Sequence, residues 1–141
     1  MVTKMFVPFL FVLFSFNVLS AQVIGEIFDA DYANKEFGEV VSFVEVNNSE
    51  LTGMLKEAGE YIMLNINTGN VRALNGERKS VTGFAESESE VFYKMSTSQV
   101  NLLLKKGGKK TTRIEMRPKT LTVTNSAFTL EMVLGCPPKC D

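Results

Sequence analysis

The sequence predicts an α+β fold in which an antiparallel sheet carries two helices on one face. Three observations lead to this prediction. Apolar and polar residues alternate in several short segments, as in half-buried strands. Two other segments place apolar residues at helical spacing and stop at glycine. The order strand, helix, hairpin occurs twice, which suggests two tandem units at about residues 40–80 and 91–134.

Residues 1–21 are typical of a signal peptide that is removed after export. Lys4 is the only charged residue before Glu26. The apolar run that follows Lys4 spans about 12 residues, whereas a membrane-spanning helix needs about 20. Cleavage after Ala21 would therefore leave no permanent membrane anchor. We expect the mature protein to be secreted or periplasmic.

The rest of the chain has a length that suits one compact domain. Its expected parts are an acidic lead-in over residues 22–39, a single α+β domain over residues 40–135 with a connector at residues 85–90, and a tail over residues 136–141. The connector is expected to be exposed, because the alternating carboxylates of its ESESE segment repel one another.

The first unit begins with a β-branched segment, VVSFVEV at residues 40–46, which favours a strand. A helix follows, since the next apolar residues fall at i, i+3, i+4 and i+7 and Gly59 then stops the pattern. These apolar residues are Leu51, Met54, Leu55 and Ala58. Two strands around a glycine-containing turn, at residues 61–66 and 71–74, complete the unit.

The second unit repeats this order, with a strand at residues 91–95. Ser96 and Gln99 have the spacing of a capping box at the start of a helix, and the pair Gly107-Gly108 ends that helix. Three strands of a meander follow, at residues 111–117, 120–124 and 128–132.

An offset of 49 residues superposes the two units. It aligns Ser49 with Ser98, Leu55 with Leu104, Lys56 with Lys105 and Gly59 with Gly108. This order could come from duplication of one unit, or from two unrelated segments that both obey the rules of helix capping.

Charge is divided unevenly along the mature chain. Residues 22–92 hold 13 acidic and 5 basic side chains, whereas residues 93–141 hold 3 acidic and 9 basic ones. The two halves could attract each other within the fold, or each could meet a different partner.

The sequence contains no histidine, which removes the commonest general base and the commonest metal ligand. No local spacing marks a catalytic set of carboxylates, lysine or threonine, so a non-catalytic protein is favoured and a small enzyme is the open alternative. The sequence predicts no cofactor and no metal site. Nucleic acid is a disfavoured partner, because no aromatic residues alternate with the basic ones.

Cys136 and Cys140 are the only cysteines. In an exported protein such a pair favours a disulfide, which a turn at Pro138-Lys139 would allow. A thiol-disulfide activity is the alternative function of this pair, although redox pairs usually have two intervening residues.

The meander offers the best candidate for a binding surface. Its strands alternate apolar residues with arginine, glutamate and threonine, so the polar face is expected to be flat and exposed. The candidate binding residues are Arg113, Glu115, Arg117, Thr120, Thr122, Thr124, Thr129 and Glu131. The sequence thus predicts an exported binding module for an unidentified macromolecule, either protein or glycan. A small inhibitor-like protein is a related alternative, since such proteins have a similar layout.

Overall fold

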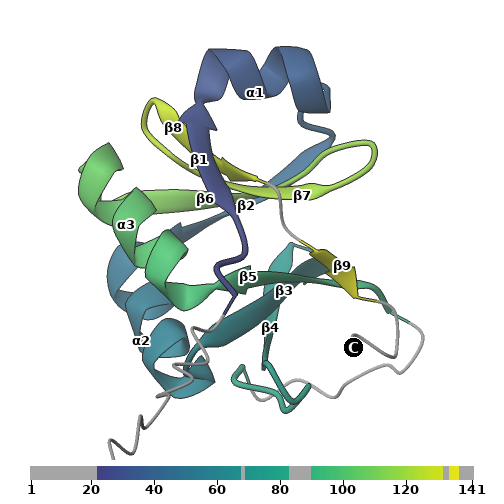
Figure 1. The fold of residues 1–141 in the computed structure, drawn as a ribbon, viewed down its shortest axis with the longest axis vertical. Coiled ribbons are helices and arrows are strands. Elements are labelled where there is room, and N and C mark those ends of the chain that lie inside the picture. Colours follow the sequence, from purple (N-terminus) through teal and green to yellow (C-terminus); the bar gives the residue numbers. More distant parts are fainter. Residues whose placement is uncertain (1–21, 68, 83–89, 132–133, 137–141) are drawn as a thin grey trace, which may run out of the picture.

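The computed structural model describes residues 22–67, 69–82, 90–131 and 134–136, and these form an α+β fold with antiparallel strand pairing throughout (Figure 1). This confirms the predicted fold class. The expected signal peptide at residues 1–21, most of the connector at residues 85–90, and Cys140 lie outside the described residues.

The strands form two sheets. The five-stranded sheet has the order β1 (Glu26–Asp29), β8 (Phe128–Glu131), β7 (Leu121–Asn125), β6 (Thr111–Met116) and β2 (Ser42–Asn47). The four-stranded sheet has the order β4 (Asn70–Asn75), β3 (Tyr61–Asn67), β5 (Phe92–Ser96) and β9 (Leu134–Cys136). The helices are α1 (Ala30–Phe37), α2 (Asn48–Ala58) and α3 (Thr97–Gly107).

One main apolar core lies between the inner faces of the two sheets and the helices α2 and α3. The helix pattern seen in the sequence supplies part of it, since Leu51, Met54, Leu55 and Ala58 are all buried. In α3 the residues Val100 and Leu103 are fully buried as well. Figure 1 shows α2 and α3 side by side against both sheets, while α1 lies apart from them on the far side of the five-stranded sheet.

The two predicted units exchange their first strands, and this exchange produces two sheets where one was expected. Strand β2 pairs with β6 of the second unit, and β5 pairs with β3 of the first. The registers correspond: the last residue of β2, Asn47, lies opposite Thr111, and the last residue of β5, Ser96, lies opposite Tyr61. The helices that follow also correspond, because α2 and α3 both have 11 residues and start 49 positions apart.

The expected acidic lead-in contains a strand and a helix. Strand β1 pairs with β8, and α1 follows it directly. The Asp29 side chain caps α1 by accepting from the Asp31 N–H at 3.1 Å. Ala33 is fully buried, and the Phe28 ring packs against Tyr32 and Phe37. A short helix with one small buried residue leaves little periodic signal in a sequence.

The capping box expected at Ser96 and Gln99 does not form. Ser96 makes no side-chain cap bond, and its hydroxyl accepts instead from the Ile24 N–H at 2.8 Å. The Gln99 amide donates to the Gly25 carbonyl at 2.9 Å. Both polar side chains therefore fix the N-terminal segment across the start of α3, where backbone groups of a distant segment compete successfully with the local cap.

Candidate functional site

The polar face of the five-stranded sheet, expected to be exposed, is largely buried, and α1 contacts this sheet at β1 and β8. Two of its threonines, Thr122 and Thr129, are fully buried. The charged residues Glu115, Arg117 and Glu131 are only 3–5% exposed. The remaining candidates, Arg113, Thr120 and Thr124, are partly buried. The prediction of a flat exposed face is therefore wrong, because the sequence pattern of a wet face does not reveal a cover supplied from elsewhere in the chain.

Arg117 ties α1 to the sheet below it. Its guanidinium donates to the Asn34 side chain of α1 at 2.8 Å and to the Gly38 carbonyl at 2.5 Å. On the sheet it donates to the Thr122 hydroxyl at 2.9 Å and to Glu115 at 3.3 Å. A buried guanidinium with this many acceptors is held in one place and is not available to a partner.

Glu115 is the acceptor at the centre of the same network. Its Oε1 atom accepts from Thr122 at 3.3 Å and from Thr124, and it pairs with Arg117. Its Oε2 atom lies 3.6 Å from Arg113 Nε. The network thus balances one carboxylate against two guanidinium groups and two hydroxyls, an arrangement that stabilises buried charge.

Arg113 is the one charged candidate with a substantially accessible side chain, at 38% exposed. It lies at the edge of the network, and its guanidinium stacks on the Phe43 ring at 3.6 Å from the centroid. Phe43 is itself 51% exposed and its neighbour Val41 is 70% exposed. Together, Val41, Phe43 and Arg113 form an accessible patch where β2 borders solvent.

β2 is also the last strand of its sheet, with β6 as its one strand partner in the described ranges. The Asn48 N–H donates to the Lys110 carbonyl at 3.0 Å. This bond sets the alternation of an antiparallel ladder, so the backbone groups of Val44 and Val46 point toward β6. Those of Phe43, Glu45 and Asn47 point away from β6, along an edge that carries no other strand of the described residues.

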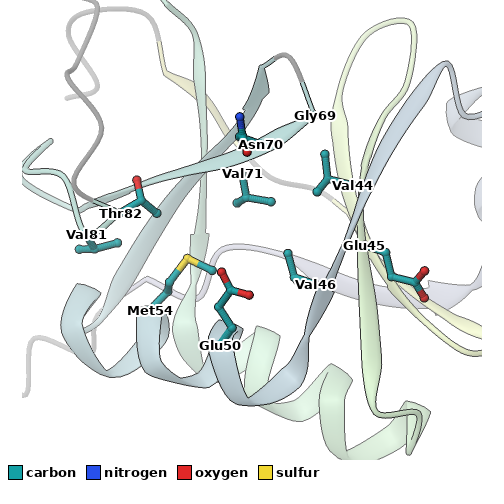
Figure 2. Close-up of a pocket in the computed structure, with 10 residues that line it drawn as sticks. All are labelled: Val44, Glu45, Val46, Glu50, Met54, Gly69, Asn70, Val71, Val81 and Thr82. Carbon is teal, nitrogen blue, oxygen red and sulfur yellow. The ribbon is translucent and has the colours of Figure 1, made fainter.

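A groove of about 440 Å³ runs beside this edge, between β2, α2 and β4 (Figure 2). Val44 and Val46 face it from β2, Met54 from α2 and Val71 from β4. The groove is large enough for side chains, since a water molecule takes up only about 30 Å³. A groove along an unpaired strand edge, with both apolar and polar side chains in its walls, is the geometry that extended peptides use in strand addition.

The charged residues that line the groove are acidic. Glu45 and Glu50 line it, and the other polar lining residues, Asn70 and Thr82, are neutral. Figure 2 shows Glu45 on the side of β2 away from Val44 and Val46, as strand alternation requires. Glu45 accepts one hydrogen bond, from the Thr111 hydroxyl at 2.7 Å.

The described part of the chain holds no group of three or more acidic or cysteine side chains placed to bind a metal ion. None of the helices in the described ranges has the length and hydropathy of a membrane span. The backbone of Cys136 belongs to β9, and its expected partner Cys140 lies beyond the described residues, so the disulfide stays a prediction.

Comparisons with protein-family models, with curated proteins and with solved structures find no match for the chain. Function is therefore argued from the site itself.

Sequence reasoning found Arg113 but missed the rest of this site. The segment VVSFVEV is apolar on both faces, a pattern usually typical of a strand buried on both sides. Strand alternation places Phe43 on the face of the strand that points away from the core. A large apolar residue at such a position was the one sign of an accessible surface in the sequence. The groove could not be foreseen, because it forms between β2 and β4, which lie in different sheets.

Proposed function

We propose that the chain is an exported, non-catalytic binding module that holds an extended segment of a partner protein along the β2 edge. The observation that carries the proposal is a six-residue edge strand with outward-facing backbone groups, an accessible phenylalanine and a groove beside it that is lined in part by valine and methionine. The β2 edge replaces the buried meander face as the proposed binding surface. Arg113 is the residue that the two surfaces share.

A polypeptide fits this surface better than a glycan does. The edge offers a row of alternating N–H and C=O groups, which the backbone of another strand satisfies completely. Side chains of such a strand alternate, so that every second one enters the groove between Val44, Val46 and Val71.

The other strand edges are less suitable. β4 has 6 residues, but its outer side already bonds to the chain that follows it: Val81 N–H donates to Ala73, and Asn75 N–H donates to Lys79. β1 has only 4 residues and carries acidic residues at both ends. In the described chain, β2 thus offers the longest uncovered edge.

A proline substitution at the edge tests this proposal. Glu45→Pro removes an outward N–H and places a ring where an added strand would lie, while the ladder bonds to β6 remain. Glu45→Ala is the matched control, because it removes the same side chain and keeps the N–H. Peptides selected for binding from a displayed random library should bind the proline variant at least about tenfold more weakly than the alanine variant, or about 1.4 kcal/mol.

Mapping the selected peptides on the unmodified protein by backbone amide NMR keeps the test valid if the proline variant fails to fold. The largest shifts should occur at Phe43, Glu45 and Asn47. Selected peptides that shift another surface, or that bind both folded variants equally, would contradict the proposal.

A further inference from the structure

We infer that the partner segment runs antiparallel to β2 and carries, from its N-terminus to its C-terminus, an apolar residue, a lysine or arginine, and two further apolar residues. This inference rests on the proposed function and adds the chemistry of the partner. It follows from three features: the strand that covers the corresponding edge of β5, the alternation of side chains along β2, and the charge at Glu45.

The direction follows from β5, which occupies in the second unit the place that β2 occupies in the first. The Ser96 N–H at the end of β5 points outward and donates to the Ile24 carbonyl at 2.9 Å. Farther along the same edge, β9 pairs antiparallel with β5, with Phe92 opposite Cys136 and Lys94 opposite Leu134. The offset of 49 residues places Phe43 and Glu45 of β2 at these two positions.

Phe43 differs from its counterpart in exposure. Phe92 is fully buried and packs with Met63 and Leu74, whereas Phe43 is 51% exposed. Phe43 is capped on one side by Arg113. A side chain added over Phe43 would remove apolar area from water, at about 25 cal/mol per Å². The partner residue opposite Phe43 is therefore apolar.

Strand alternation assigns the next three partner positions. The residues opposite Val44 and Val46 point into the groove on the side of these two valines, where Met54 and Val71 also face. Pairing across the strands with valine assigns apolar residues to both positions. The residue opposite Glu45 points to the other side of the sheet. Because an opposite charge across a strand pair is favourable, that residue is basic. Since the added strand is antiparallel, its chain direction runs from the position opposite Val46 to the position opposite Phe43.

Charge favours this partner over a second copy of the chain. If two copies joined through β2, the acidic groove of each, with Glu45 and Glu50, would come close to that of the other. Like charges facing each other across paired strands are destabilising. A basic segment of another protein meets the same carboxylates with a favourable sign.

The test uses the full chain and a displayed library of random heptapeptides, selected in parallel on three proteins. These are the unmodified chain, Glu45→Lys, and Glu57→Lys. Glu57 is an exposed residue of α2 that does not line the groove, so its reversal controls for net charge. Peptides from the unmodified chain and from Glu57→Lys should be enriched in lysine or arginine between apolar residues. Peptides from Glu45→Lys should carry aspartate or glutamate at that position, and the original peptides should bind this variant at least tenfold more weakly.

The outcomes separate the two proposals. Peptides that shift the β2 amides but show no basic preference, or that bind Glu45→Lys unchanged, would overturn the partner chemistry and leave the binding edge in place. Peptides that bind elsewhere would overturn the proposed function itself. A dimer seen by sedimentation at micromolar concentration, and lost in the Glu45→Pro variant, would assign the edge to a second copy and overturn the inference.

Discussion

At the scale of single residues, Arg117 shows how a surface that looks polar in sequence can hold the fold together. The Arg117 and Glu115 side chains are 2% and 4% exposed and lie 3.3 Å apart. Replacing Arg117 by Met removes its donors and leaves the buried Glu115 carboxylate with Arg113 as its charged partner, beside the Thr122 and Thr124 hydroxyls. We expect a loss of about 3–5 kcal/mol in the free energy of unfolding, measured by urea denaturation.

Glu115, which pairs with Arg117, provides the control for this effect. If the loss of stability comes from the Glu115 carboxylate that Arg117→Met leaves without its arginine, removing that charge should restore part of it. The double variant Glu115→Gln with Arg117→Met should then be more stable than Arg117→Met alone, by about 1 kcal/mol or more. Equal stability of the two variants would mean that Arg117 acts through packing and through its bonds to α1.

At the scale of elements, glycine has opposite effects at one position in α2 and one in α3. A Cβ at Gly107 would lie 1.9 Å from the Asn125 side-chain oxygen and 2.6 Å from the Asn125 carbonyl oxygen. Asn125 cannot easily move, because it is buried and bonds to Lys109, Thr111 and Thr112. Gly107→Ala should therefore destabilise the protein by about 1–3 kcal/mol.

Gly53 in the middle of α2 is the matched case, because a Cβ there would meet nothing within 4 Å. Gly53→Ala should stabilise the protein by about 0.5–1 kcal/mol, since alanine loses less backbone entropy in a helix. Thermal unfolding of both variants measures the two effects. A stabilised Gly107→Ala variant would contradict the close approach of α3 to β7.

Elements with a repeated apolar pattern could be predicted from the sequence, whereas β1 and α1 could not. The stripe of α2 and the alternation of Ile114, Leu121 and Val123 repeat often enough to reveal the buried face, and these residues are buried. The helix α1 has 8 residues, of which Ala33 alone is buried. Its position over the sheet depends on Arg117, which bonds to Asn34 across a separation of 83 residues in sequence.

At the scale of the whole molecule, the sequence suggested two tandem units but not how they combine. Local patterns specify a strand and its neighbours in the chain, and they do not specify that β2 pairs with β6 while β5 pairs with β3. The same exchange places the edges of β2 and β5 at corresponding positions. In the described residues, β5 carries β9 on its outer edge and β2 carries no strand there. This asymmetry is the basis of the proposed function.

Amide hydrogen exchange of the free protein, resolved by residue, tests this asymmetry most directly. Outward amides of β5, at Phe92, Lys94 and Ser96, should be protected, and the corresponding amides of β2, at Phe43, Glu45 and Asn47, should exchange rapidly beside protected Val44 and Val46. A selected peptide should then protect the three β2 amides. Equal protection of both sets in the free monomer would show that the β2 edge is already paired and would contradict the account.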